Sequence, residues 1–138
     1  SAPGERLYRE MLWASQFCLV ANGTANVNTA RLTEAIMHGC IPVVVADDFQ
    51  APFHRNLNWS DFAVFARTSE IDTLQDKLSG ISHAAADAKR VALQDVAPYM
   101  DMKDGSFWFL FIDSMIEGMR ISFDSNSEGG HCRSRPTS

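Results

Sequence analysis

A glycine-bearing loop and the helix that follows it, residues 22–39, carry side chains suited to binding a phosphate group. Free backbone N–H groups and the helix dipole converge where a loop opens a helix, and Gly23 lets the backbone approach a ligand closely. The hydroxyls of Thr24 and Thr29 can donate hydrogen bonds to phosphate oxygens, and the Arg31 guanidinium can hold a phosphate with two N–H groups. These residues predict an anion-binding site.

Glu34 lies three residues after Arg31, so the two side chains share one face of the expected helix. A carboxylate accepts hydrogen bonds from vicinal hydroxyls such as those of a ribose, and together with a phosphate grip it makes a nucleotide site. The alternative interpretation is an ordinary surface ion pair worth about 0.2–0.5 kcal/mol, and spacing alone favours it. The sequence contains neither the GxGxxG pattern of dinucleotide-binding folds nor a P-loop.

For the other candidate ligand-binding residues, a purely structural role is favoured over a role in binding. His38 follows Glu34 by one turn and could reach the same cleft, but histidine is common near a helix C-terminus for its charge. Asp47 and Asp48 follow an apolar run at the edge where α/β proteins bind ligands, and capping of the next loop is the favoured role. Stacking on a base is less expected than core packing for three aromatic residues, Phe53, Trp59 and Phe62. No histidine has metal-ligand spacing, no nucleophile elbow is present, and the catalytic base is unassigned.

The hydrophobic pattern around this segment alternates between strand and helix. The apolar run at 17–20 predicts a buried strand, and Asn28 or Thr29 is expected to cap a helix through about His38. That helix has an apolar stripe and ends at Gly39; the stripe is Leu32, Ala35 and Ile36. Residues 41–46 are β-branched and apolar, which predicts an interior parallel strand and a right-handed βαβ unit.

The other elements follow from the same patterns. We expect a short helix at 8–14, a strand at 62–66, and helices at 71–81, at 84–97 and at 107–119. Pro98 is expected to stop the second of these helices, and the third is expected to be buried because it starts apolar all round. From residue 124 the composition is polar, which predicts a disordered tail. The expected organisation is one domain at 1–123 and a tail at 124–138.

The amino-acid composition argues against nucleic acid as a partner and against a segment that spans a membrane. The 138 residues are 46% hydrophobic, a size and composition typical of one soluble globular domain. With 12 Lys and Arg against 17 Asp and Glu, a nucleic-acid partner is not expected. No apolar stretch approaches the roughly 20 residues that span a bilayer, and residues 1–10 lack a secretory signal pattern.

Several blocks, in order, carry a resemblance to a known family. They are SQFCLV at 15–20, Gly23, TARLTEAI at 29–36, GCIPVV at 39–44, Asp48, Pro52-Phe53 and LNWSDF at 57–62. This stretch, from Tyr8 to Ile81, resembles the exostosin family of glycosyltransferases. The resemblance implies the C-terminal, nucleotide-sugar-binding domain of a GT-B enzyme with two Rossmann-like domains. It implies inverting, metal-independent transfer of a hexosyl or pentosyl group from a nucleoside diphosphate, with UDP expected, to a polysaccharide or glycan hydroxyl.

The resemblance also implies roles for individual residues. Arg31 would hold the donor diphosphate with Thr29, Gly23 and Thr24, and Glu34 would hold the ribose. The loop is rich in Asn and residue 21 is Ala, where the family has a basic loop and a proline. The alternative function is a truncated, non-catalytic α/β fragment, or a protein-interaction module without nucleotide binding.

Whether the cysteines are paired or free indicates whether the protein is located in an oxidising or a reducing compartment of the cell. From the residues alone, Cys18 and Cys40 are expected to be small buried apolar groups, and Cys132 has no evident partner. The resemblance implies a disulfide between Cys18 and Cys40, and with it the lumen of the Golgi or secretory pathway. The family's acceptor domain and membrane anchor have no counterpart in these residues, so we expect the isolated chain to be inactive.

Overall fold

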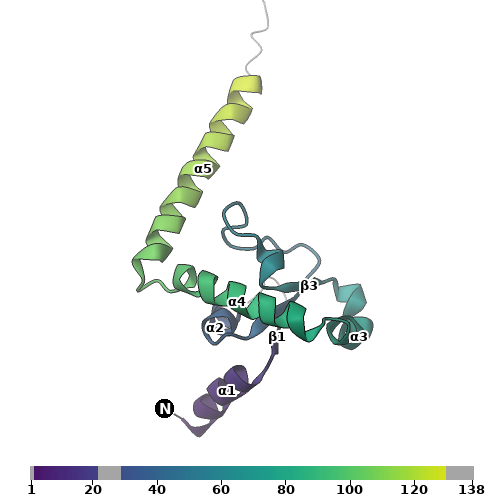
Figure 1. Ribbon diagram of the computed structural model, residues 1–138. Helices are drawn as coiled ribbons and strands as arrows, with labels where there is room; N and C mark the ends of the chain where they lie inside the picture. The colour runs from purple at the N-terminus through teal and green to yellow at the C-terminus, as the bar shows by residue number, and fades with distance from the viewer. Residues whose placement is uncertain (1, 22–28, 130–138) are drawn as a thin grey trace, which may run out of the picture.

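The computed structural model describes residues 2–21 and 29–129, and the side chains of 29 and 123–129 are not described. Helices and strands alternate through the first half of the described chain, and helices follow. The elements are α1 (Pro3–Ala14), β1 (Phe17–Ala21), α2 (Thr29–Met37), β2 (Ile41–Val45), the 3₁₀ helix η1 (Trp59–Asp61), β3 (Val64–Ala66), the 3₁₀ helix η2 (Thr68–Thr73), α3 (Leu74–Ser79), α4 (His83–Met100) and α5 (Gly105–Gly129). This mixed α/β architecture confirms the expected fold class (Figure 1).

The three described strands form a parallel sheet in the order β1-β2-β3. All five residues of β2 are buried, which confirms the interior strand that the apolar run predicted. In β1 the expectation of burial holds on one face only: Val20 is buried, whereas the side chain of Leu19 is 58% exposed. The reason is position, because in the described part of the chain β1 lies at the edge of the sheet and little covers its second face.

Helix α2 packs against the sheet and against α4. Its predicted apolar stripe is confirmed, since Leu32, Ala35 and Ile36 are all buried. The helix ends where Gly39 takes a φ of +71°, a left-handed conformation that favours glycine, and the Gly39 N–H donates to the carbonyl oxygen of Ile36 at 3.1 Å. The predicted βαβ unit is therefore present, with β1 and β2 paired in parallel.

The helix expected at 71–81 is shorter and starts differently. A 3₁₀ helix occupies Thr68–Thr73, and only Leu74–Ser79 is α-helical. The carboxylate of Glu70 accepts a hydrogen bond from the backbone N–H of Arg67 at 2.6 Å and so caps the 3₁₀ turn, which begins before the predicted stripe. The side chain of Ile71 is consequently exposed, while Leu74, Leu78 and Ile81 pack against the core.

Pro98 does not stop α4, which continues to Met100. A proline in the last turn of a helix removes a single intrahelical hydrogen bond, and burial of the Met100 side chain accompanies the extra turn. The prediction of the end at residue 97 was therefore wrong. At the other end, Ser82 accepts a hydrogen bond from the backbone N–H of Ala85 at 3.1 Å and caps the helix.

Helix α5 rises away from the rest of the domain (Figure 1). The prediction that it is buried was wrong: Leu110 is the one buried residue among its described side chains. An apolar helix is buried only where another element covers it, and α5 is covered on one side. The helix also runs to Gly129, so the expected tail at 124–138 is helical over 124–129, and 130–138 lie outside the described residues. No helix in the described ranges combines the length and apolarity that a membrane span requires.

Candidate functional site

A cavity of about 300 Å³ lies between α1, β1 and α2. Its lining is apolar along β1 and also carries polar side chains: Tyr8 from α1, Ser15 from the residue that follows α1, and Arg31 from α2. Because α2 returns antiparallel to the strands, its first turn lies at the carboxyl edge of the sheet, where α/β proteins bind ligands. The cavity therefore has one guanidinium on its wall near that edge.

Tyr8 lies near both predicted side chains and is hydrogen-bonded to one of them, Glu34. Its hydroxyl donates a hydrogen bond to Oε2 of Glu34 at a distance of 3.0 Å. Burial raises the pKa of the Tyr8 phenol, the bond to the Glu34 carboxylate raises it further, and the charge of Arg31 lowers it. Arg31 and Glu34 thus lie on the same side of α2, each close enough to act on one phenol.

The sequence analysis missed Tyr8. It lies 26 residues before Glu34, in a helix that precedes the motif strand, and no local pattern links the two positions. A tyrosine on a short helix just before the apolar run was the only signal available. Contacts of this kind depend on how α1 folds back beside α2, which spacing does not reveal.

The remaining expected phosphate ligands are only partly placed. Thr29 opens α2, but its side chain is not described. Gly23 and Thr24 lie outside the described residues. The described ranges contain no group of three or more His, Cys, Asp or Glu residues that could hold a metal ion.

His38 does not line the cavity. Its Nδ1–H donates to the backbone carbonyl of Glu34 at 2.7 Å, and its ring meets the Trp13 ring edge-on at a centroid distance of 5.3 Å. This is the role of a polar residue at the end of a helix, which was the favoured interpretation.

Asp47 has the structural role that was favoured for it. Its Oδ1 accepts a hydrogen bond from the backbone N–H of Thr68 at 2.9 Å, and this bond lowers the pKa of the Asp47 carboxyl. Asp48 is exposed at the same edge of the sheet. The carboxylate of Asp47 therefore joins the end of β2 to the start of η2.

The aromatic candidates pack in the core rather than around a ligand. Trp59 and Phe62 are buried with ring centroids 4.8 Å apart, and the Trp59 indole N–H donates to the carbonyl of Pro52 at 2.7 Å. Phe53 meets Phe107 of α5 edge-on at 6.0 Å. Core packing was the expected role.

Cys18 and Cys40 are joined by a disulfide, the pairing that the resemblance implies. The parallel register explains their proximity, because Cys18 pairs with Pro42, two residues after Cys40. Their Cα atoms are 5.8 Å apart. The bond links β1 to the residue that precedes β2, and so holds the two strands on either side of α2.

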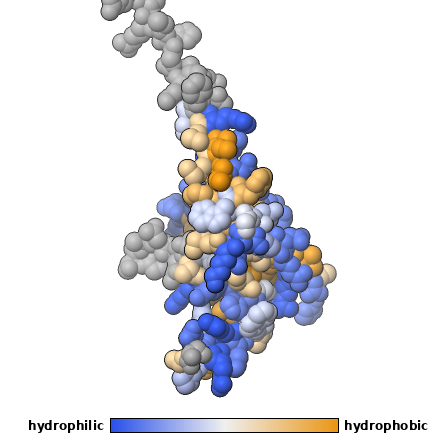
Figure 2. All heavy atoms as spheres, turned by 90° about the vertical axis from the view of Figure 1, so that its left-hand side faces the viewer, coloured by the Kyte–Doolittle hydropathy of each residue, from blue (hydrophilic) through white to orange (hydrophobic). Residues whose placement is uncertain are grey.

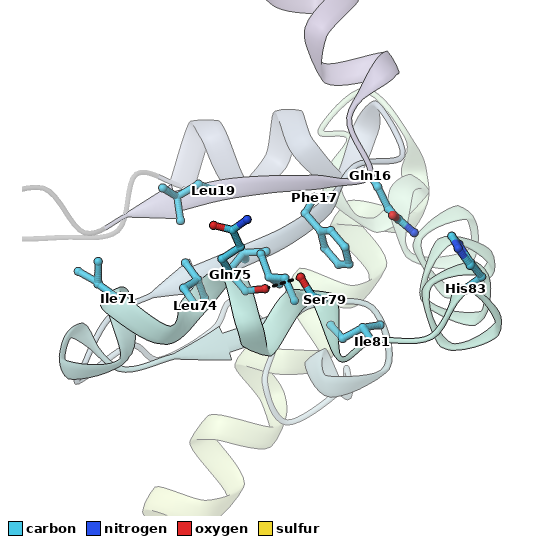
Figure 3. A pocket seen from close by; sticks show the side chains of 11 residues that line it. Gln16, Phe17, Leu19, Ile71, Leu74, Gln75, Ser79, Ile81 and His83 are labelled. Atoms are coloured by element: carbon cyan, nitrogen blue, oxygen red, sulfur yellow. Dashed lines mark hydrogen bonds between the residues drawn. The ribbon is translucent and has the colours of Figure 1, made fainter.

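A second, larger hollow of about 660 Å³ lies over the other face of β1 and β2 (Figure 3). In Figure 3, Phe17 and Leu19 from β1 lie across from the side chains of Leu74 and Gln75 on α3. Among the described residues that line it there is no lysine or arginine, and His83 is the one titratable residue. Its chemistry does not suit a phosphate group, so the cavity beside Arg31 is the better candidate.

Comparison with known proteins places these observations in a family. Residues 1–79 match the Exostosin GT47 domain. The chain is 38% identical over 74 residues to a "Probable glycosyltransferase" of Arabidopsis thaliana, an alignment that covers 54% of this chain and 16% of that protein. It is also 38% identical over 74 residues to a "Probable glucuronosyltransferase" of Oryza sativa subsp. japonica, covering 54% of this chain and 18% of that protein.

A "Probable beta-1,4-xylosyltransferase" of Arabidopsis thaliana is similar to the same degree, 38% identical over 74 residues, covering 54% of this chain and 18% of that protein. The chain thus spans only 16% to 18% of the length of these relatives. The family match covers more than half of the chain, including α1, the βαβ unit, Arg31 and Glu34. A parallel sheet flanked by helices is the architecture expected of part of a GT-B enzyme. The chain therefore belongs to the exostosin family of glycosyltransferases.

Proposed function

We propose that this domain binds the diphosphate and the ribose of a UDP-sugar, as the donor-binding part of an inverting, metal-independent glycosyltransferase that acts on a glycan hydroxyl. The observation that carries the proposal is that Tyr8 and Arg31 line one cavity near the start of α2, while Glu34, which does not itself line that cavity, accepts a hydrogen bond from Tyr8. A cation for phosphate and a carboxylate for hydroxyls are the two groups that a nucleoside diphosphate requires.

Arg31 would neutralise the charge that develops on the diphosphate as the sugar leaves. A guanidinium is always charged at neutral pH and presents N–H groups in a planar fork that matches phosphate oxygens. Its position near the start of α2 adds the helix dipole to the same site. Both effects stabilise the leaving group more than the intact donor, and this difference is what accelerates transfer.

Glu34 would accept hydrogen bonds from the ribose hydroxyls. A carboxylate has about four acceptor positions, so one bond from the Tyr8 hydroxyl orients it and leaves capacity for a diol. Tyr8 is thus a positioning residue for Glu34. This role depends on the phenol remaining protonated, which its raised pKa favours.

Transfer also requires an acceptor hydroxyl held in line with the anomeric carbon, an arrangement that can be worth roughly 7–11 kcal/mol of the barrier. We assign that task, and the general base, to an acceptor domain outside these residues. The isolated chain is accordingly expected to bind UDP without transferring sugar. The disulfide fits an oxidising compartment, so we place the whole protein in the Golgi or secretory-pathway lumen, attached through an anchor outside this chain.

Isothermal titration of UDP into the chain tests the phosphate grip. Wild type should bind, and Arg31→Ala should weaken UDP binding by about tenfold to a hundredfold, because a charge-assisted bidentate contact is lost. Arg67→Ala is the matched control, since Arg67 is also an exposed arginine and does not line the cavity. Equal affinity of the two variants would overturn the assignment of Arg31.

The ribose contact is tested with 2′-deoxy-UDP. Wild type should prefer UDP over the deoxy form, and Glu34→Gln should reduce this preference, because the amide presents one acceptor oxygen in place of two. An unchanged preference would remove Glu34 from the site.

The Tyr8–Glu34 bond also supports a second candidate, a protein-interaction module or non-catalytic fragment in which the bond merely ties α1 to α2. In that case wild type would give no binding heat with UDP, while Tyr8→Phe would still lower the free energy of unfolding.

A further inference from the structure

Two segments of the sequence fit the pattern that accepts an N-linked glycan, an asparagine followed two residues later by serine or threonine, with no proline between them. They are NGT at 22–24 and NWS at 58–60. The first lies outside the described residues. The second lies where the loop after β2 ends and η1 begins. We call residues 58–60 the sequon.

The fold exposes the two sequon residues whose side chains take part in modification. Asn58 and Ser60 are exposed, whereas Trp59 between them is buried. The Asn58 side-chain nitrogen Nδ2 carries two hydrogens, and it donates a hydrogen bond to Oδ1 of Asp61 at 3.0 Å. A glycan replaces one of the two hydrogens, which leaves the other for the bond to Asp61.

We propose that Asn58 carries an N-linked glycan. The proposal rests on the secretory compartment proposed above, which the disulfide between Cys18 and Cys40 fits. In the transfer, Nδ2 of Asn58 forms a bond to the anomeric carbon of an oligosaccharide, and the bond from that carbon to the diphosphate of a lipid-linked donor breaks. The lipid diphosphate leaves, and one amide proton passes to a base of the transferring enzyme. Neither partner is oxidised or reduced.

Asn58 lies away from the candidate donor cavity. It lines a hollow of about 540 Å³ together with Phe65 of β3 and residues of the loop after β2. Strands β1 and β3 lie on opposite sides of β2, and in the described part of the chain no residue lines both this hollow and the cavity beside Arg31. A glycan on Asn58 is therefore compatible with UDP binding.

The surface around Asn58 suits a sugar. Exposed apolar residues gather on α5, where it rises above the domain (Figure 2), and the sequon lies outside that helix. The hollow beside Asn58 has polar side chains on its wall, Gln50, His54 and Asn56, which can bond to sugar hydroxyls. The ring of Phe65 in the same hollow is 37% exposed, and covering it with the apolar face of a sugar ring would be favourable.

The backbone of η1 indicates when the sugar is added. The N–H of Asp61 donates to the carbonyl oxygen of Asn58 at 3.1 Å, and the N–H of Ala63 donates to that of Trp59 at 2.9 Å. Drawing Asn58 into the active site of another enzyme would break these bonds and expose Trp59, which requires local unfolding. Transfer is therefore expected on the chain before η1 folds.

Peptide mass spectrometry before and after digestion with peptide N-glycosidase tests the proposal, because this enzyme removes the glycan and leaves Asp in place of Asn. The samples are the whole protein from its own cells, and this chain made behind a cleavable secretory signal peptide in cultured eukaryotic cells. The chain is recovered from cells and medium alike, so the result does not depend on secretion. In both samples, position 58 should become Asp only after digestion, whereas Asn56, which is outside any sequon, should stay Asn.

Substitutions at Ser60 separate recognition of the sequon from folding. Ser60→Ala should abolish the glycan, because the hydroxyl that the transferring enzyme recognises is lost, and Ser60→Thr should retain it. Ser60 accepts a hydrogen bond from Nζ of Lys89 at 2.6 Å through its backbone carbonyl, which both variants keep. Asn58→Gln should also abolish the glycan, and Asn56→Gln is the matched control that should retain it.

The two samples distinguish a failure of the sequon from a failure of the proposed compartment. An unmodified Asn58 in the chain made behind the signal peptide would overturn the proposal, whatever the compartment of the whole protein. A glycan on that chain, together with an unmodified Asn58 in the whole protein, would overturn both the modification and the proposed compartment. A glycan that persists in Ser60→Ala would contradict recognition of this sequon. None of these outcomes depends on UDP binding, which the titration of Arg31→Ala tests separately.

Discussion

The hydroxyl of Tyr8 and the carboxylate of Glu34 are joined by a hydrogen bond of 3.0 Å across 26 residues of sequence. The bond connects α1, which precedes the sheet, to α2, which follows β1. Arg31 lies close enough to act on the same phenol. One contact therefore orients the carboxylate that we assign to the ribose and holds the two helices that border the candidate cavity.

Replacing Glu34 by Gln should lower the pKa of Tyr8 toward the ordinary tyrosine value of about 10. The carboxylate raises that pKa, both as hydrogen-bond acceptor and through its charge, and a neutral amide removes the charge. Ultraviolet absorbance of tyrosinate during alkaline titration measures the change. The chain has two tyrosines, so Tyr8→Phe identifies the signal that belongs to Tyr8.

The same shift has a consequence for stability. The folded pKa of Tyr8 is raised, so this group's contribution to stability is fully present below the unfolded pKa and is lost as pH rises through the folded pKa. The loss should be smaller in Glu34→Gln. An identical alkaline titration in wild type and Glu34→Gln would contradict the contact.

Breaking the disulfide should lower the free energy of unfolding by about 2–4 kcal/mol, because the unfolded chain gains the freedom of the closed loop. Urea denaturation of Cys18→Ser and of Cys40→Ser measures the loss. Cys132→Ser is the control and should unfold like wild type. Each single variant should lose as much free energy of unfolding as the double variant that carries both substitutions. If the two single losses instead add up in the double variant, the two cysteines contribute separately and not through one bond.

Truncating Ile36 to Ala should cost about 2–5 kcal/mol, because its side chain is 1% exposed and packs in the central cluster between α2 and the sheet. Met37→Ala, the next residue on the same helix, has an exposed side chain and should cost much less. Urea denaturation of both variants provides the measurement. Similar costs at the two positions would mean that α2 faces the sheet in another orientation.

Gly39→Ala should destabilise the fold by about 1 kcal/mol, since a φ of +71° is strained for a residue with a Cβ. Apart from residue 39 itself and its two chain neighbours, no atom of the described residues lies within 4 Å of the place where that Cβ would stand, so the cost comes from the backbone conformation and not from a clash with packed neighbours. Gly39→Asn should cost less, because Asn adopts this conformation more readily. Gly4→Ala, also in open space but within α1 and without a positive φ, should show no loss in thermal unfolding.

The sequence by itself determined the βαβ unit and the side of α2 that faces the sheet. Leu32, Ala35 and Ile36 recur at helical spacing, Gly39 follows them, and a β-branched run comes next. These are local patterns, since each depends on residues within a few turns of one another, and the structure reproduces them. The positions of Arg31 and Glu34 on one side of the helix follow from the same spacing.

Only the tertiary structure decided which elements meet and which stay uncovered. It brought Tyr8 to Glu34, left Leu19 exposed at an edge of the described sheet, and turned most of the described side chains of α5 toward solvent. In each case the residues involved are distant in sequence or lack a covering element. A side chain's hydrophobicity states what it would gain from burial, whereas packing of whole elements decides whether that burial occurs.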